Sequence, residues 1–357
     1  MDLQLEWIVV TLTQQMIDLR SDTITKPCSN MLEAMLKANV GDDVYGEDPT
    51  VKELEKKVCD FFGTEMSMFF PSGTMANQTA IKLHTSPGNQ VITHKFSHVF
   101  NYEGGGGSFN SGVSFKLLDG PKGIFQINDI INAINPKSFY HAPLSKLVVL
   151  ENTTNKGGGA CWDVEVFRDI KKVCKDHDLG LHMDGARIWN SLIANKNNPL
   201  IYGENFDTIS VCLSKGLGCP IGTVLTGKKE ILKNALRIRK IFGGGMRQVG
   251  YLAAAGIYAL NNNIERLAKD HDKAKQIAKE LKRKNFVKGL NEVETNIIII
   301  ELIESFNKQN IIDFFMGQNV IMDWHSMGSN KIRLVTHLDY SDSDHKNFLA
   351  ILDKCII

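Results

Sequence analysis

Apolar positions between about residues 50 and 260 alternate between helical spacing and short strand-like runs. The apolar positions of 51–61 follow helical spacing and stop at Gly63, which is typical of an amphipathic helix and its end. Residues 66–70 then form a short apolar run that we interpret as a buried strand. An alternation of this kind predicts an α/β fold with a parallel sheet covered by helices.

The middle of the chain contains the clearest unit of this type. Residues 146–150 and 179–183 are apolar runs, and residues 164–176 between them place their apolar side chains on one helical face. Strand, helix and strand in this order predict a βαβ unit. Beyond it we expect strands at 208–213 and 223–226 and a helix through Ile231, Ala235 and Ile238 that ends at Gly243–Gly245.

The pattern changes near residue 261. A long amphipathic helix is expected over 264–281, followed by the β-branched run 297–300 and by strands near Val320 and Ile332. Ser341 with Asp344 three residues later is a capping-box pattern that predicts the start of a last helix. We therefore divide the chain into an extension at 1–15, a large α/β domain at 16–260 and a small C-terminal α+β domain at 261–357.

The composition limits the functions open to this chain. Its 357 residues exceed the usual size of one hydrophobic core, and 41 basic against 40 acidic residues give a net charge of +1. This balance provides no overall field that would attract nucleic acid or an anionic membrane, so any anion site must be local. The longest apolar stretch, around 251–260, is about half of the ~20 residues that a membrane span needs.

The seven cysteines and residues 1–16 indicate the cellular compartment in which the chain is expected. The seven cysteines are scattered, and they form neither a C-x-x-C pair nor a zinc spacing, so we expect no metal site. A reducing, cytoplasmic compartment is the simplest interpretation of unpaired cysteines. Residues 1–16 contain no Lys or Arg, which argues against a signal or transit peptide.

Ser72-Gly73-Thr74 follows the predicted strand at 66–70 and opens a helix. Free backbone N–H groups at a helix start bind anions, and Gly73 would let a phosphate approach the backbone. The segment lacks the glycine patterns of dinucleotide and ATP sites. An ordinary N-capped helix is the alternative interpretation.

Asp184 stands at the carboxyl end of the predicted strand 179–183. In open α/β sheets, ligands bind at that end of the strands. A carboxylate there could keep a cationic ring nitrogen protonated by charge pairing. The alternative is an aspartate that forms a turn with the following Gly185.

Lys215 follows the predicted apolar strand at 208–213, and Gly216 comes after it. A lysine in such a setting can be desolvated, which lowers its pKa and exposes a nucleophilic amine suited to Schiff-base chemistry. A solvated loop lysine is the alternative. Together, a phosphate anchor, an acid for a ring nitrogen and an imine-forming lysine are what pyridoxal 5'-phosphate (PLP) requires.

With these three segments the chain resembles the low-specificity L-threonine aldolases, which are fold-type I PLP enzymes. The resemblance covers most of the chain from Ile17 onward. It is carried, in chain order, by 17–23 (IDLRSDT), 43–50 (DVYGEDPT), Ser72-Gly73-Thr74, 183–187 (MDGAR), 214–218 (SKGLG), 243–248 (GGGMRQ) and 333–337 (RLVTH). It implies a mostly parallel seven-stranded sheet with helices on both faces and a smaller C-terminal domain.

The resemblance also implies roles around the cofactor. Lys215 would form the imine with PLP, Asp184 would pair with the pyridine nitrogen, and Ser72, Gly73 and Thr74 would bind the phosphate. His98 resembles the imidazole that stacks on the ring. Arg247 resembles a residue that reaches the phosphate, often across a subunit boundary, and Arg187 would contribute to the cofactor site as well as to substrate binding.

On the substrate side, Arg187 and Arg333, with Ser21, resemble the residues that hold the substrate carboxylate. His141 resembles a second active-site histidine, and Tyr45 a residue contributed near the subunit interface. Taken singly, the arginines could be surface residues, the histidines structural, and Tyr45 a turn residue packing on Pro49.

The activity implied is the retro-aldol cleavage of L-threonine or L-allo-threonine to glycine and acetaldehyde by a homodimer or homotetramer with shared active sites. Neither nucleic acid nor membrane is an expected partner. Other PLP reactions, such as β-elimination, transamination or serine-hydroxymethyl cleavage, would use the same lysine and aspartate. A non-catalytic binding subunit of the same fold would be expected to lack one of them, and this chain has both.

Overall fold

Seven strands between Met66 and Gly227 form one sheet in the order β2-β8-β7-β6-β5-β3-β4 in the computed structural model, which describes residues 16–355. Six of these strands run parallel to one another, and β8 alone is antiparallel to its neighbours. The strands are β2 (Met66–Phe70), β3 (Gln90–His94), β4 (Ser114–Leu118), β5 (Ser145–Glu151), β6 (Gly180–Gly185), β7 (Thr208–Cys212) and β8 (Thr223–Gly227).

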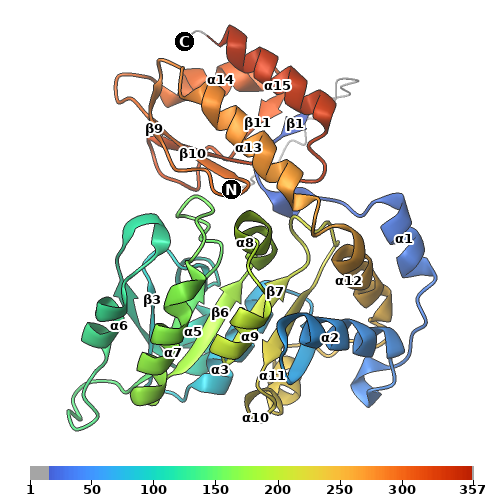
Figure 1. Cartoon of the computed structure of the whole chain (residues 1–357), viewed down its shortest axis with the longest axis vertical. Helices are drawn as coiled ribbons and strands as arrows, with labels where there is room; N and C mark the ends of the chain where they lie inside the picture. Colours follow the sequence, from blue (N-terminus) through green and yellow to red (C-terminus); the bar gives the residue numbers. More distant parts are fainter. Residues whose placement is uncertain (1–15, 356–357) are drawn as a thin grey trace, which may run out of the picture.

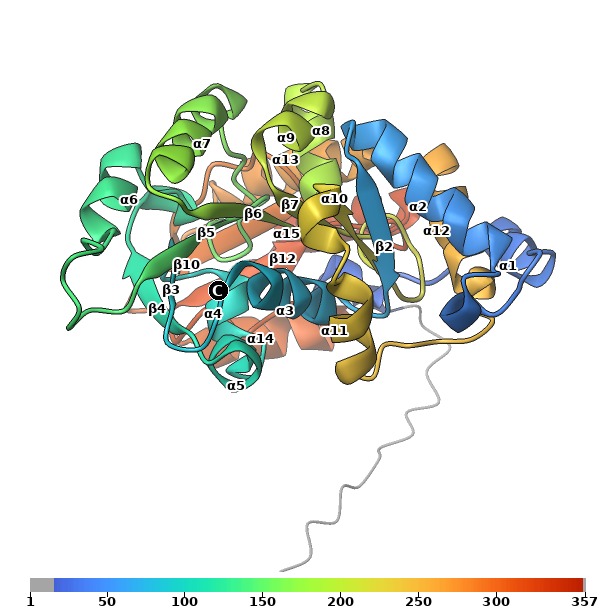
Figure 2. The same cartoon turned by 90° about the horizontal axis from the view of Figure 1, so that it is seen from below.

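Helices cover both faces of this sheet (Figures 1 and 2). Figure 2 shows α7, α8 and α9 on one face and α3, α5 and α11 on the other. The predicted α/β class with a mostly parallel seven-stranded sheet is confirmed. The helices up to residue 262 are α1 (Ser29–Leu36), α2 (Pro49–Phe62), α3 (Gly73–His84), α4 (His98–Asn101), α5 (Gly106–Ser111), α6 (Ile127–Ala133), α7 (Phe167–Asp176), α8 (Ile188–Asn195), α9 (Leu200–Asn205), α10 (Lys229–Leu232), α11 (Ala235–Ile241) and α12 (Gly250–Asn262).

The C-terminal elements build a second hydrophobic core against a small antiparallel sheet of order β12-β10-β9. Figure 1 shows this part, coloured orange and red, beyond one end of the large sheet. β1 (Ile17–Asp18) pairs with β11 in this second core, although the predicted division assigned residues 16–260 to the large domain. The remaining elements are α13 (Leu267–Leu281), β9 (Val287–Leu290), β10 (Ile297–Leu302), α14 (Lys308–Gly317), β11 (Val320–Ile321), β12 (Lys331–Val335) and α15 (Asp342–Lys354).

The division at residue 260 stays a prediction, and the extension 1–15 lies outside the described residues. The capping box of the last helix is confirmed: the Ser341 hydroxyl accepts from the Asp344 backbone N–H, and the Asp344 carboxylate accepts from the Ser341 N–H. None of the helices within 16–355 is long and apolar enough to cross a membrane.

Two predicted features differ from the structure. The strand at 223–226 is present, but it runs antiparallel because only residues 213–222 join it to β7. A parallel crossover needs about a dozen residues or more, so a connection this short returns the chain in the opposite direction. The single helix predicted through Ile231 and Ile238 is two helices, α10 and α11, interrupted at Lys233 and the poor helix former Asn234.

Parallel pairing places several charged side chains at one edge of the sheet. Because β5, β6 and β7 run in the same direction, their carboxyl ends lie side by side. Glu151 at the end of β5 is the register partner of Asp184 in β6, and Lys215 follows β7 by three residues. This edge also faces the second core, since Thr25 and Asn155 connect it to the N-terminal and C-terminal segments.

Candidate active site

Asp184 is a buried carboxylate with hydrogen bonds but no ion pair. Its Oδ2 accepts from Asn77 Nδ2 at 3.1 Å and its Oδ1 accepts from the Ala186 backbone N–H at 3.1 Å, while the residue is 2% exposed. No Lys, Arg or His among residues 16–355 forms an ion pair with it. Because a buried negative charge is unfavourable without a cationic partner, the position suits a ligand that carries a protonated nitrogen.

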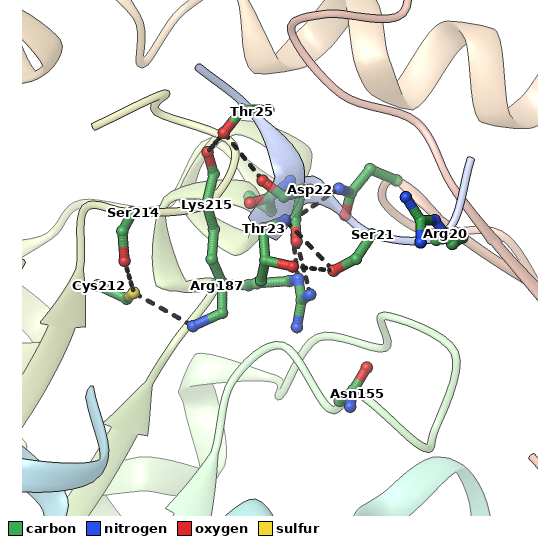
Figure 3. A network of polar contacts seen from close by, with 12 residues as sticks. Arg20, Ser21, Asp22, Thr23, Thr25, Asn155, Arg187, Cys212, Ser214 and Lys215 are labelled. Carbon is green, nitrogen blue, oxygen red and sulfur yellow. Dashed lines mark hydrogen bonds and ion pairs between the residues drawn. The ribbon is translucent and has the colours of Figure 1, made fainter. Parts of the chain in front are cut away.

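Lys215 is half-buried near the same edge, and it too lacks an ion pair with the described part of the chain. Its Nζ donates to Cys212 Sγ at 3.1 Å, and its backbone carbonyl accepts from Thr25 Oγ1 at 2.7 Å. Figure 3 shows the amine beside Cys212, with the backbone tied to Thr25. The amine is thus held in place but not neutralised by a carboxylate, as a nucleophilic lysine requires.

The positive charge of Lys215 affects the pKa of the neighbouring Cys212 thiol. Burial raises the pKa of the Cys212 thiol, but the positive charge of Lys215 and hydrogen bonds outweigh burial, and the pKa is lowered overall.

Gly218 has φ +79°, and a Cβ there would lie 2.7 Å from the Leu338 side chain, so only glycine fits without a shift. The turn after Lys215 therefore depends on this glycine.

The start of α3 combines an N-cap with free donors. Ser72 Oγ accepts from the Met75 backbone N–H at 3.1 Å, so the capped-helix interpretation is correct for Ser72. The backbone N–H groups of Gly73 and Thr74 have no acceptor within the described chain. A Cβ on Gly73 would meet only the Thr223 hydroxyl, at 3.6 Å, so the space beside this helix start is open to an anion.

His98 begins α4 and is held by two carboxylates. Its backbone N–H donates to Glu151 Oε2 at 2.6 Å, and its ring Nδ1 lies 2.9 Å from Glu103 Oε1. Burial lowers the pKa of His98, but the hydrogen bond to Glu103 and nearby carboxylates outweigh it and raise the pKa overall. Polar atoms of His98, Glu103 and Asp184 all lie within 4.8 Å of one another, which brings His98 to the Asp184 site.

Such a group of three could in principle hold a metal ion. Glu103, however, already accepts hydrogen bonds from Asn77, Gln78 and His98 at 2.8, 2.6 and 2.9 Å. These bonds account for the proximity of the three side chains. The donor set fits PLP better: an unpaired amine, an unpaired buried carboxylate and open N–H groups match an aldehyde, a pyridine nitrogen and a phosphate.

Arg187 makes a buried pair with Asp22. Its Nε and Nη2 donate to the two oxygens of Asp22 at 2.8 and 2.7 Å, and Asn296 Nδ2 donates to the same carboxylate at 3.2 Å. Burial alone would raise the pKa of Asp22, but the Arg187 charge outweighs it and holds the pKa at about 2. Nη1 of Arg187 has no partner within 16–355 and is free for a carboxylate ligand.

Arg333 approaches Arg187 from the small sheet. Its Nη1 donates to Asn155 Oδ1 at 2.7 Å, and its Nη2 lies 2.9 Å from Asp323 Oδ2. Burial lowers the pKa of Arg333, and the positive charge of Arg187 lowers it further. Ser21 lies next to Asp22, where its hydroxyl accepts from Thr23 (Figure 3). Two cations thus converge from separate cores.

Asp22→Asn is expected to lower the free energy of unfolding by about 3–5 kcal/mol, because it leaves the buried Arg187 without its anion. The folded pKa of Asp22, about 2, lies below the unfolded value of 3.8, so its contribution of about 2 kcal/mol is present above pH ~4 and lost as the pH falls toward 2. Urea unfolding at several pH values measures both effects. The exposed α13 residue Asp272, as Asp272→Asn, is the matched control, and equal stability of the two variants would contradict the expectation.

Tyr45 and Arg247 lie together on the surface. Arg247 Nη1 is 2.9 Å from Asp42 Oδ2, and its guanidinium carbon lies 5.7 Å from the centre of the Tyr45 ring. The Tyr45 residue is 74% exposed and the Arg247 side chain 55%. Neither contacts Lys215 or Asp184, so within one chain the structure does not bring this pair to the other candidates.

His141 also lies elsewhere. It belongs to the loop that precedes β5, next to Tyr140, whose ring centre is 4.0 Å from its own. This loop is at the amino ends of the parallel strands, whereas Asp184 and Lys215 are at the carboxyl ends. The grouping of His141 with His98 is therefore corrected for a single chain: the length of β5 separates the two edges.

Several site residues were not predicted from the sequence. Asp22, Asn77, Glu103 and Glu151 contact the predicted candidates, and each is buried. Glu151 carried a usable signal, since it ends an apolar run just as Asp184 does. Glu103 and Asn77 carried none, because their roles arise only when α3 and α4 pack beside β6.

Known proteins resemble this chain in sequence and fold. Residues 18–305 match the family model described as Beta-eliminating lyase. The low-specificity L-threonine aldolase of Escherichia coli strain K12 is 38% identical over 91% of this chain and 95% of its own length. Low-specificity L-threonine aldolase 1 of Arabidopsis thaliana is 37% identical over 96% of each chain. A threonine aldolase structure from Leishmania major shares the fold, with a TM-score of 0.82 and 21% identity over 95% of this chain and 99% of that one.

Proposed function

Because the chain belongs to the β-eliminating lyase family and, by its identity with them, to the low-specificity L-threonine aldolases, we propose that it cleaves L-threonine and L-allo-threonine to glycine and acetaldehyde with PLP. It would be an aldehyde-lyase that acts on β-hydroxy-α-amino acids. The observation that carries the proposal is the pair of unneutralised groups, Asp184 and Lys215, at adjacent strand ends. Such an enzyme would serve threonine catabolism and glycine formation.

Six residues would hold the cofactor. When bound, PLP supplies an electron sink that makes cleavage of the bond between Cα and Cβ feasible. Lys215 Nζ would carry the aldehyde carbon, the Asp184 carboxylate would keep the ring nitrogen protonated, and His98 would cover a ring face. The free N–H groups of Gly73 and Thr74, with the nearby hydroxyl of Ser72, would bind the phosphate.

The substrate carboxylate would be bound by the two arginines. Arg187 Nη1 is free, and Asp22 fixes the rest of its guanidinium group. Arg333 is held by Asn155 and Asp323, and Ser21 lies beside Asp22. Clamping the carboxylate fixes which bond of Cα stands perpendicular to the ring, so positioning selects the bond that breaks.

His98 is the group that we assign as the acceptor of the β-hydroxyl proton. Its Nδ1–H donates to Glu103 in the neutral ring, which leaves Nε2 as the acceptor. The side chain is 36% exposed, so Nε2 can be reached from the open side of the site. A raised pKa strengthens the base once Nε2 is unprotonated.

Product analysis tests the proposal. L-allo-threonine and L-threonine are expected to yield glycine and acetaldehyde in equal amounts from the purified, PLP-loaded protein. L-serine and L-cysteine are expected to yield little pyruvate, which is the product of β-elimination. Dominant pyruvate would favour an eliminating lyase, and a protein that binds no PLP would favour a non-catalytic binding subunit.

The surface pair Tyr45 and Arg247 supports a homo-oligomer, a dimer or a tetramer, with shared active sites. Both side chains are exposed, so a second copy could receive them at its own site. Exposed apolar side chains occur on the elements around them, namely Leu36, Leu236, Ile241 and Tyr251. In this arrangement Arg247 would reach the phosphate of PLP bound to the neighbouring chain.

Mixing two inactive variants tests the shared site. Lys215→Ala and Arg247→Ala are each expected to be inactive or nearly so, but hybrids that carry both chains contain one complete site. Random reassortment through unfolding and refolding should restore about a quarter of wild-type activity, since about half of the dimers are hybrids with one working site of two. No recovery from hybrids of confirmed composition would contradict a shared site.

We also propose a cytoplasmic location. All seven cysteines are unpaired, and several of them, such as Cys174 and Cys219, are deeply buried. Free thiols persist most readily in a reducing compartment. Neither nucleic acid nor a membrane is proposed as a partner.

A further inference from the structure

Asn77 occupies the centre of a buried polar cluster between α3 and the sheet. It is 2% exposed, and its Nδ2 donates one hydrogen to Asp184 Oδ2 at 3.1 Å and the other to Glu103 Oε1 at 2.8 Å. Its Oδ1 accepts from Ser210 Oγ at 2.7 Å, and His182 Nε2 lies 3.2 Å from the same oxygen. Both hydrogens of the amide are therefore used, and its oxygen has at least one donor.

The two carboxylates fix the orientation of this amide. In the reversed orientation, Oδ1 would face Asp184 and Glu103, and three oxygens would repel one another. Burial lowers the pKa of His182 to about 3, so its ring is neutral and carries a single N–H. The ring lies between acceptors on both sides: its Nε2 is 3.2 Å from Asn77 Oδ1, and its Nδ1 is 3.1 Å from the Thr208 carbonyl oxygen and 2.9 Å from the Thr208 hydroxyl.

The polar chain continues to the opposite edge of the sheet. Thr208 Oγ1 lies 2.9 Å from Nε2 of His84, at the C-terminal end of α3. Burial lowers the pKa of His84 to about 4, so this ring is neutral as well. A series of polar contacts thus runs along α3 from His84 through Thr208 and His182 to Asn77, and it ends at Asp184.

The cluster also contains acidic groups that need donors. Burial, together with the charge of the adjacent Asp184, raises the pKa of Glu151 to about 7. Glu103 and Asp184 lie close together on the other side of the site. Each N–H of Asn77 donates to one of these two carboxylates, and hydrogen bonds to charged groups are the strong ones.

We propose that Asn77 is a positioning residue for the cofactor ring. One N–H sets the Asp184 carboxylate that pairs with the ring nitrogen, and the other sets Glu103, which orients His98 over the ring. A single amide would thus govern both of the noncovalent contacts that we assign to the ring. This inference rests on the proposed PLP-dependent function.

Asn77→Ala is expected to lower kcat by about 10-fold to 100-fold, as removal of residues that orient catalytic groups does, with KM changed by less than about 3-fold. It is also expected to shift the wavelength of the visible absorbance band of bound PLP, because the setting of the ring nitrogen changes. A merely structural role would change stability but not the band. Thr79→Ala, on the same helix, fully buried and without a hydrogen-bond partner for its hydroxyl, is the matched control and should leave both the band and kcat near wild type.

Asn77→Ser provides the second variant in case the alanine variant does not fold. One hydroxyl can donate to only one of the two carboxylates, so its kcat and band should lie between those of wild type and alanine. Wild-type protein that binds no PLP would overturn the proposed function itself. An unchanged visible band and an unchanged kcat in the folded Asn77 variants would overturn only the positioning role.

Discussion

Lys215→Ala is expected to lower turnover of L-allo-threonine by at least about 10⁴-fold, the scale of loss when a catalytic nucleophile is removed. The variant should also lose the visible band of covalently held PLP. The reason is structural: Lys215 lies just beyond the carboxyl end of β7, its Nζ donates a hydrogen bond to Cys212, and it forms no ion pair with a carboxylate of residues 16–355.

Lys172→Ala supplies the matched control for this change. Lys172 is an exposed residue of α7, where alanine favours the helix, so activity and the visible band should stay at the wild-type level. A correctly folded Lys215→Ala protein that keeps a borohydride-reducible cofactor would contradict the assignment. So would turnover within about 10-fold of wild type, which is about 1.4 kcal/mol of barrier.

Asp184→Asn is expected to give the second largest effect, a loss of about 10²-fold to 10³-fold in kcat, typical of removing one group that stabilises developing charge. The amide keeps the size of the side chain but removes the negative charge. Without that charge, the side chain that would pair with the ring nitrogen no longer favours its protonated form, and the cofactor becomes a weaker electron acceptor. Steady-state kinetics with saturating PLP measure this loss.

The control for Asp184→Asn is Asp178→Asn, the same substitution at the other edge of the sheet. Asp178 is exposed, pairs with Lys146, and has φ +61°, which asparagine tolerates well. Asp178→Asn should therefore be active. Retention of full kcat by folded Asp184→Asn protein, together with tight PLP binding, would rule out the role of Asp184 at the ring nitrogen.

Local patterns were sufficient for the elements that carry the central pair. Apolar runs and the order of strand, helix and strand placed β5 and β6, and parallel pairing then put the residues at their ends side by side. Asp184 and Lys215 could be singled out because each follows such a run. The phosphate-site segment was recognisable for the same reason, as a strand end followed by a helix start.

Contacts that depend on packing could not be obtained from the sequence alone. The direction of β8 and the place of His141 are different, because both follow from the predicted strands: a short connection reverses β8, and His141 precedes the strand at 146–150 and so lies at its amino end. Asp22 and Arg187 are 165 positions apart and meet only after the two cores pack together. Asn77 looked like one more polar residue of a helix, and its contacts appear only once α3 lies on the sheet.

The attachment of PLP to Lys215 is the central claim, and one chemical measurement tests it most directly. Wild-type protein is loaded with PLP, reduced with borohydride and digested, and the peptide that carries the reduced cofactor is identified by mass spectrometry. The modification is expected on Lys215 alone, and it should be absent from the Lys215→Ala protein. Modification of another lysine, or none in a correctly folded protein, would contradict the assignment.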